Sequence, residues 1–200
     1  MAAFQWFVDL QVREGVVPNA VAESAESSES RFLNGRLAML FNSRRGVPTY
    51  RTIQDLNWDV APLPNGPVQA GILHSDGYCM AASTADKGAA WAFVEFANSP
   101  EGQLLVAETG RTVPSLVTVA NSPQFLAPLK APANSAVFVE TIATLRRVPT
   151  MTTWAGVEET ASREIERAFY GLATVEEAAA TAARLAQPYF DAQPVNDRSD

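Results

Sequence analysis

The sequence contains a single histidine (His74) and a single cysteine (Cys79) among its 200 residues. This scarcity excludes a metal centre built from histidine and cysteine ligands, and it excludes a disulfide within the chain. The glycine-rich phosphate motif GxGxxG and the nucleophile motif GxSxG are also missing. Catalysis would therefore depend on carboxylates, tyrosine, serine or arginine. We expect a protein that is not an enzyme and uses no cofactor.

Lysine is almost absent, because only Lys87 and Lys130 accompany thirteen arginines, and the net charge is −7. An acidic chain is a poor partner for nucleic acid, and the lack of lysine tracts disfavours an anchor on anionic membranes. The first residues carry no basic stretch followed by a long apolar run, so no signal peptide is present in this chain. The 47% apolar and 18% charged residues are typical of an ordinary globular protein.

Capping patterns and apolar periodicity predict six helices. Thr174 and Glu177 form a T-x-x-E box, Ser99-Pro100-Glu101 combines a cap with a proline at the first helical position, and Ser83 with Asp86 resembles a capping box. The predicted helices span residues 3–14, 83–97, 99–110, 135–145, 154–170 and 174–187.

Short apolar runs bounded by turn residues predict three strands, at residues 37–41, 58–63 and 78–82. Residues 19–30 contain Glu, Ser and Ala without apolar periodicity, and we expect an exposed connection with one helical turn. Strands dispersed among helices indicate a mixed α/β fold.

Polar and aromatic residues next to the predicted strands and helix ends form the candidate site, because ligands of open α/β sheets bind beside strand ends. Arginine offers a fork of donors, aspartate offers acceptor oxygens, and tyrosine or tryptophan offers a flat apolar face, which together suit a sugar. Each residue also has an ordinary structural interpretation, as a loop, turn or packing residue. The candidates are Ser43, Arg44, Asp76, Tyr78, Arg111 and Trp154.

Five segments, taken in order, resemble the extracellular solute-binding proteins of bacterial ABC sugar importers. The family often has Gly-x-Trp after its A-M segment, whereas this chain has Asn42-Ser43-Arg44-Arg45-Gly46, so that loop supplies no stacking aromatic. The similar segments are Phe32–Met39 (F-x-x-G-x-x-A-M), Trp58–Gly66 (D-V-A-P-L-P-x-G), Gly77–Phe96 (G-Y-x-I with A-A-W-x-F), Ser99–Gln103 and Thr109–Ser115.

The resemblance implies a periplasmic-binding-protein-like (type II) fold of two lobes, with a sugar or related polyol bound in the cleft between them. It further implies that the closed protein presents its ligand to the membrane subunits of the transporter. Five of the candidate residues are expected to face the cleft, namely Ser43, Arg44, Asp76, Arg111 and Trp154. The implied location is periplasmic, or extracellular with a lipid anchor. No catalysis is expected.

Family members are considerably longer, and the chain resembles only their later half. The resemblance implies that residues 1–75 and 118–190 belong to the C-terminal lobe, that residues 76–117 cross to the N-terminal lobe, and that residues 191–200 form a frayed tail. Because strands would lack neighbours, we expect an exposed apolar patch and self-association of the 200-residue chain.

Two alternatives remain open. A glycan-acting enzyme would need two facing carboxylates, for which Asp76 with Glu158 or Glu159 is the only pair that we can nominate. An interaction module without catalysis would instead show an apolar groove without convergent polar groups.

Overall fold

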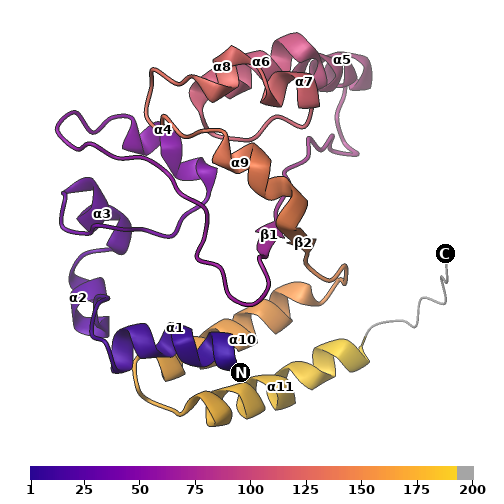
Figure 1. Cartoon of the computed structure of the whole chain (residues 1–200). Coiled ribbons are helices and arrows are strands. Elements are labelled where there is room, and N and C mark those ends of the chain that lie inside the picture. Colours follow the sequence, from indigo (N-terminus) through magenta and orange to yellow (C-terminus); the bar gives the residue numbers. More distant parts are fainter. Residues whose placement is uncertain (193–200) are drawn as a thin grey trace. The chain divides into compact units, whose positions relative to one another are not determined.

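A computed structural model describes residues 1–192 of the chain. The chain divides into two compact units, which are described separately (Figure 1). Unit 1 contains Met1–Ser30 and the chain from Val148 onward, and unit 2 contains Arg31–Arg147. The predicted frayed tail at 191–200 lies outside the described residues, except for Asp191 and Ala192.

Unit 1 is helical, and its two longest helices lie side by side as an antiparallel hairpin (Figure 1). The first helix of the chain packs on both of them. The side chains of Val8, Ala168, Val175 and Ala178 form the buried core between these three helices. The helices of unit 1 are α1 (Ala2–Val12), α2 (Ala20–Ala25), α10 (Trp154–Phe169) and α11 (Val175–Asp191).

Local capping explains where the helices of unit 1 begin. The Thr174 hydroxyl accepts a hydrogen bond from the Glu177 N–H (3.1 Å), and the Glu177 carboxylate accepts one from the Thr174 N–H (3.0 Å), which confirms the predicted capping box. The predicted helices at 3–14 and 154–170 are also confirmed. Gly171 follows α10 with a φ of 73°, in the left-handed region that glycine enters without strain.

Residues 19–30 contain more helix than the predicted exposed connection with one helical turn. The side chain of Asn19 accepts a hydrogen bond from the Ala22 N–H (2.9 Å) and starts α2. A second short helix, α3 (Ser28–Leu33), follows and crosses the boundary between the units. Asparagine is a strong N-cap residue, so its side chain stabilises the start of a helix in a segment that lacks apolar periodicity.

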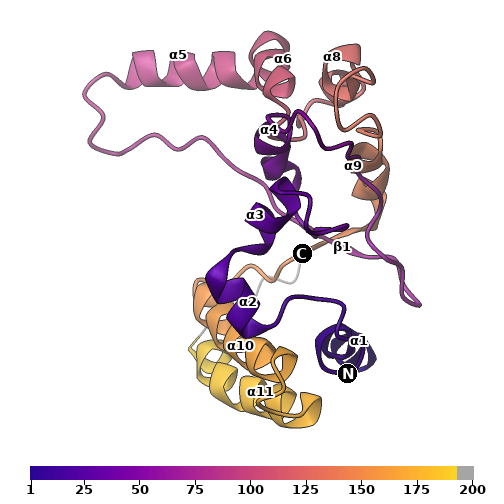
Figure 2. The same cartoon turned by 90° about the vertical axis from the view of Figure 1, so that its left-hand side faces the viewer.

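Unit 2 combines short helices with a very small sheet (Figures 1 and 2). The sheet has two parallel strands, in which Gly71 pairs with Leu145 and Leu73 pairs with Arg147. The elements of unit 2 are η1 (Arg44–Gly46), α4 (Val47–Tyr50), β1 (Gly71–Leu73), α5 (Lys87–Asn98), α6 (Pro100–Thr109), α7 (Val117–Ala120), α8 (Pro123–Leu126), α9 (Val137–Glu140), η2 (Thr141–Thr144) and β2 (Leu145–Arg147).

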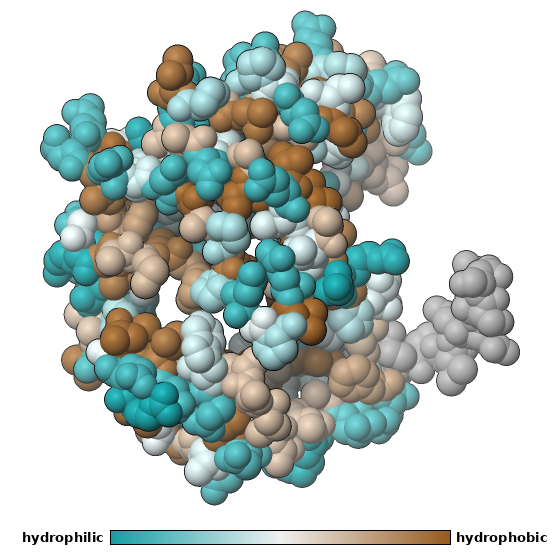
Figure 3. All heavy atoms as spheres, viewed as in Figure 1, coloured by the Kyte–Doolittle hydropathy of each residue, from teal (hydrophilic) through white to brown (hydrophobic). Residues whose placement is uncertain are grey.

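All three predicted strands are wrong, since residues 37–41, 58–63 and 78–82 carry no strand assignment. A strand exists only where a neighbouring strand takes its backbone hydrogen bonds, and among the described residues only β1 and β2 provide such a neighbour. The apolar side chains of these segments consequently stay exposed, with Met39 at 85% and Phe41 at 58%. Figure 3 shows hydrophobic residues at the surface of both units.

Among the helices of unit 2, the predicted one at 99–110 is confirmed as α6. The Ser99 hydroxyl accepts a hydrogen bond from the Gly102 N–H (3.2 Å), and Gly110 ends the helix with a φ of 81°. The helix predicted from Ser83 begins one turn later, at Lys87, because the Asp86 carboxylate accepts the capping bond from Ala89 N–H (2.8 Å). The short helix predicted at 135–145 corresponds to α9 and η2.

Phe125 is the centre of the core of unit 2 and is fully buried. It packs with Ala107 of α6 and Val119 of α7. Gln103 links α6 to the following loop, because its amide donates to the Ser115 hydroxyl (2.7 Å) and its carbonyl accepts from the Leu116 N–H (2.9 Å). This core supports the loop that carries the first candidate site residues.

Candidate functional site

The loop before α4 directs Arg44 into unit 2. Ser43 is exposed and caps η1, and its hydroxyl accepts a hydrogen bond from the Arg45 N–H (3.4 Å). The turn leaves Arg45 exposed and buries Arg44, which keeps only 5% of its surface exposed. Two neighbouring arginines therefore have opposite environments.

The Arg44 guanidinium lies between two aromatic rings. Its Cζ atom is 4.1 Å from the centroid of the Phe125 ring and 4.8 Å from that of the Phe138 ring. These distances are within the range of cation–π attraction. The Nε, Nη1 and Nη2 atoms of Arg44 are buried, and none of them has a hydrogen-bond partner among the described residues. The guanidinium is thus buried with its hydrogen-bonding capacity unused.

A second arginine, Arg51, lies close enough to influence Arg44. The pKa of Arg44 is lowered to about 10, mainly by burial and to a smaller extent by the positive charge of Arg51. Arg51 itself is partly buried, and burial lowers its pKa as well. Its guanidinium donates to the backbone carbonyls of Ala131 (2.8 Å) and Glu108 (3.3 Å). Within residues 1–192, no carboxylate forms an ion pair with Arg44 or Arg51.

The other candidate residues of unit 2 are exposed. Asp76 and Tyr78 lie in the irregular segment between β1 and α5, and the Tyr78 ring meets the Phe93 ring edge to face at 6.0 Å. Arg111 follows the left-handed Gly110, and its N–H donates to the Thr109 hydroxyl (3.2 Å).

Trp154 belongs to unit 1, where it is half-buried as the first residue of α10. Among the described residues, no hydrogen bond, ion pair or ring contact joins any two of the six candidate residues, and only Ser43 and Arg44 are neighbours. Their assignment to a ligand site stays a prediction.

The pair nominated for catalysis lies in different units. Asp76 is in unit 2, whereas Glu158 and Glu159 are exposed residues of α10 in unit 1. Glu159 lies 3.8 Å from Arg163 in an exposed ion pair.

Sequence reasoning missed the surroundings of Arg44. Arg51 is seven residues further along the chain, and the two phenylalanines come from α8 and the following α9. The Ser122-Pro123 cap predicts where α8 starts, since the Ser122 hydroxyl accepts from the Phe125 N–H (3.3 Å). No local pattern, however, indicates that α8 covers an arginine about 80 residues earlier.

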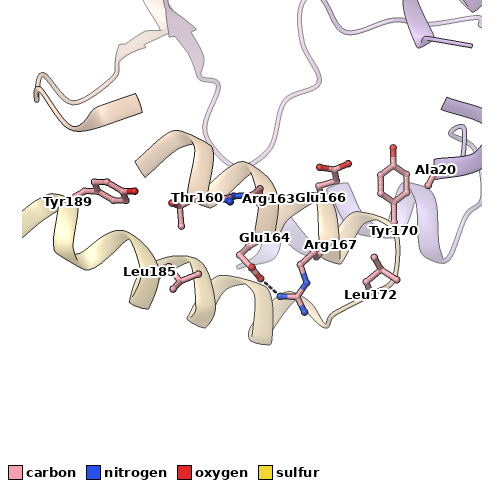
Figure 4. Close-up of a pocket in the computed structure, with 10 residues that line it drawn as sticks. All are labelled: Ala20, Thr160, Arg163, Glu164, Glu166, Arg167, Tyr170, Leu172, Leu185 and Tyr189. Carbon is pink, nitrogen blue, oxygen red and sulfur yellow. Dashed lines mark hydrogen bonds and ion pairs between the residues drawn. The ribbon is translucent and has the colours of Figure 1, made fainter. Parts of the chain in front are cut away.

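A pocket of about 750 Å³ lies in unit 1, beside α10 and α11 (Figure 4). Tyr170 and Tyr189 lie at its opposite ends. The Glu164 carboxylate, which is almost buried, accepts a hydrogen bond from Arg167 at 2.6 Å. Burial raises the pKa of Tyr170, and the neighbouring carboxylates of Glu23 and Glu166 act in the same direction. None of the six candidate residues lines this pocket.

No three His, Cys, Asp or Glu side chains within residues 1–192 are grouped so that they could hold a metal ion. In the same part of the chain, no helix combines the length and the apolar character needed to cross a bilayer.

Comparison with known proteins identifies a family and similar solved structures. The sequence profile described as "Bacterial extracellular solute-binding protein" matches residues 1–133. No curated protein sequence matches the chain.

The structure is similar to the ABC substrate-binding protein Lmo0181 from Listeria monocytogenes, which was solved in complex with cycloalternan. The TM-score is 0.75 at 18% sequence identity, and the likeness covers 90% of this chain and 47% of that chain. The chain therefore has the fold of the matched portion of a periplasmic-binding-protein-like structure. It spans about half the length of the matched protein.

Proposed function

The chain belongs to the family of bacterial extracellular solute-binding proteins, and from this premise we propose that it is the later part of the substrate-binding component of an ABC importer. The match of residues 1–133 to the family carries the proposal. The fold supports it, because the similar structure is an ABC substrate-binding protein of about twice this length. The protein would act outside the cytoplasmic membrane, in the periplasm or on a lipid anchor, and would bind its ligand without changing it.

The proposed ligand is a sugar or a related polyol. The matched Listeria protein was solved with cycloalternan, and the candidate residues provide the groups that a polyhydroxylated ring requires. Arg111 and Asp76 supply an exposed guanidinium and an exposed carboxylate, which hydrogen-bond to hydroxyl groups. Tyr78 and Trp154 supply flat apolar faces for the carbon-bound hydrogens of the ring.

Arg44 and Ser43 complete the proposed ligand site from the loop before α4. The Arg44 guanidinium has no hydrogen-bond partner in the described residues, and a buried unpaired cation is unfavourable for stability. This unfavourable contribution is offset when a bound ligand, or the movement that accompanies ligand binding, brings a hydrogen-bond partner to the guanidinium. The exposed Ser43 adds a hydroxyl group next to it.

In the proposed division between lobes, residues 1–75 and 118–190 belong to the C-terminal lobe and residues 76–117 cross to the N-terminal lobe. A ligand that contacts both lobes binds the closed form more tightly than the open form, and it therefore shifts the population toward closure. The membrane subunits of the importer would recognise the closed form.

The test is isothermal titration calorimetry of the full-length protein with a panel of neutral sugars, acidic sugars and polyols. We expect saturable binding without product. Arg111→Ala and Trp154→Ala should each weaken binding at least about tenfold, corresponding to the loss of about 1.4 kcal/mol. Arg147→Ala and Trp6→Ala are matched controls, because both residues are exposed and lie outside the proposed site.

The outcomes separate the three classes of function. Product formation, measured by chromatography of the titrated sugars, would favour the carboxylate-dependent enzyme. Absence of binding to the whole panel would leave the interaction module as the better explanation. Unchanged affinity in both Arg111→Ala and Trp154→Ala would overturn the site while leaving the sugar-binding function intact.

A further inference from the structure

The pocket beside α10 and α11, named here the α10–α11 pocket, is elongated and has a tyrosine at each end (Figure 4). At one end, the Tyr189 ring rests on Gly156, where a Cβ atom would overlap the ring. The Thr153 hydroxyl donates to the Tyr189 carbonyl (2.8 Å), and the Tyr189 side chain is still 36% exposed. The lack of a side chain at position 156 therefore makes room for a ring that is positioned but not covered.

The Tyr170 ring is positioned in a similar way at the other end. It meets the Phe169 ring edge to face (5.3 Å between centroids), and Phe169 stacks on Phe7 of α1 (4.7 Å). Between Gly156 and Tyr170, α10 rises by about 20 Å. The two tyrosines are thus too far apart for one sugar ring, and they suit the two ends of an elongated ligand.

The charged side chains between the tyrosines balance each other. Two arginines and two glutamates line the pocket, and Arg167 donates to the Glu164 carboxylate at 2.6 Å. Arg163 and Glu166 are exposed, and Glu166 makes no hydrogen bond or ion pair within the described part of the chain. The pocket consequently offers one group of donors and one group of acceptors without a net charge.

Apolar surface lies beside these polar groups. Leu172 and Leu185 line the pocket and are 72% and 43% exposed. The volume of about 750 Å³ is within the usual range of ligand sites. Flat aromatic faces, exposed apolar side chains, and donors and acceptors of balanced charge together suit a chain of uncharged sugar rings.

We propose that the α10–α11 pocket is a second carbohydrate site, which binds a neutral oligosaccharide lying along α10 with one sugar ring on Tyr170 and another on Tyr189. All the residues that line it belong to unit 1, and none of the six candidate residues is among them. The site is therefore separate from the candidate ligand site, and the proposal does not depend on that site being correct.

A peptide fits the pocket less well. An extended peptide binds by adding a strand to the edge of a sheet, and no strand lines this pocket. A helical peptide requires a continuous row of apolar contacts, which the charged Arg163 and Glu166 interrupt. A neutral sugar chain needs neither arrangement.

The test is saturation-transfer difference NMR on the full-length protein carrying Arg111→Ala, which weakens the candidate ligand site. The probes are glucose, maltohexaose, cellohexaose and the acidic hexagalacturonate. We expect one of the neutral hexasaccharides to bind at least about tenfold more tightly than glucose, because only the longer chain contacts both tyrosines. Tyr170→Ala and Tyr189→Ala should each weaken this binding about tenfold, whereas Tyr170→Phe and Tyr189→Phe, which keep the flat ring, should change it by less than about twofold.

A blocking variant covers the case in which loss of a tyrosine unfolds unit 1. Ala20 lines the pocket and is exposed, so Ala20→Trp fills the pocket without removing any packing and should abolish hexasaccharide binding. Ala3→Trp is the matched control, because Ala3 is an exposed residue of α1 in the same unit and lies outside the pocket. Its affinity for the hexasaccharide should be unchanged.

The outcomes distinguish this site from the proposed function. Unchanged hexasaccharide affinity in Tyr170→Ala, Tyr189→Ala and Ala20→Trp would overturn the second site, and so would tighter binding of hexagalacturonate. Binding of a tryptic casein digest without binding of any hexasaccharide would identify a peptide site and overturn it as well. If only Arg111→Ala reduces sugar binding, the proposed function stands and the second site fails, and if only the Tyr170, Tyr189 and Ala20 variants reduce it, the second site stands and the candidate ligand site fails.

Discussion

Replacement of Arg44 by methionine tests whether a buried guanidinium without a partner destabilises unit 2. Burial, with a smaller contribution from the positive charge of Arg51, lowers the pKa of Arg44 to about 10. At about 1.4 kcal/mol per pH unit, this lowering corresponds to about 3 kcal/mol, which screening by solvent reduces to about 2 kcal/mol. The substitution removes this penalty and the attraction to Phe125 and Phe138, which contributes about 1 kcal/mol. A methionine sulfur beside the two rings restores part of that attraction.

We therefore expect Arg44→Met to raise the free energy of unfolding by about 1–2 kcal/mol at neutral pH. The assay is urea denaturation followed by circular dichroism. Arg45→Met is the control, because Arg45 is exposed and its substitution should change stability by less than about 0.5 kcal/mol.

The pH dependence of the same variant provides a second check. Because the pKa of Arg44 is lowered in the folded state, the unfolded state binds more protons above about pH 10, and the stability of the unaltered chain rises there. The advantage of Arg44→Met should consequently shrink as the pH rises through this range. A loss of more than about 1 kcal/mol in Arg44→Met at neutral pH would refute the reasoning, since it would mean that the guanidinium already makes favourable hydrogen bonds.

Phe125→Ala should lower the free energy of unfolding by about 3–5 kcal/mol in the same denaturation assay, because Phe125 is fully buried. Phe93→Ala, at an exposed phenylalanine of the same unit, should lower it by about 1 kcal/mol or less, and equal losses would contradict the placement of Phe125 in the core. Thr174→Ala should destabilise unit 1 by about 1 kcal/mol through loss of the helix cap, whereas Thr181→Ala in the middle of α11 should not. A melting temperature unaffected by Thr174→Ala would show that α11 does not depend on its cap. The hydrogen bond from the Thr174 N–H lowers the pKa of Glu177, so the stabilisation is complete above the ordinary pKa of a glutamate and is lost as the pH falls through the lowered value. The stability difference between the unaltered chain and Glu177→Gln should therefore vanish in acid, and a gap that stays constant across pH would contradict this.

The helices that could be predicted share one property, which is that their signals are local. The Thr174–Glu177 box and the Ser99-Pro100 cap lie within four residues of the backbone groups that they satisfy. The same reasoning places the start of α5 one turn too early, because Ser83 and Asp86 both fit a cap pattern and only the Asp86 carboxylate accepts the bond.

The candidate site was predictable only as a set of residue types. Guanidinium, carboxylate and aromatic groups near strand ends suggest a polar ligand, and the resemblance to solute-binding proteins is consistent with the family match over residues 1–133. Whether a given arginine is exposed or buried is a property of the folded chain. Arg44 and Arg45 are adjacent in the sequence, yet only Arg44 is covered by aromatic rings from α8 and α9.

The amino-acid sequence by itself determined the helix caps, the absence of a histidine or cysteine metal cluster, and the family, because these depend on neighbouring residues or on composition. The tertiary structure decided which extended segments become strands and which charges are buried, because both need partners that are distant in the sequence. Leu145 pairs with Gly71 from more than 70 positions away, whereas the apolar run at 37–41 finds no partner among the described residues and stays exposed. Backbone groups of a strand find their hydrogen-bond partners, and charged groups lose their contact with water, only when distant parts of the chain come together in the folded protein.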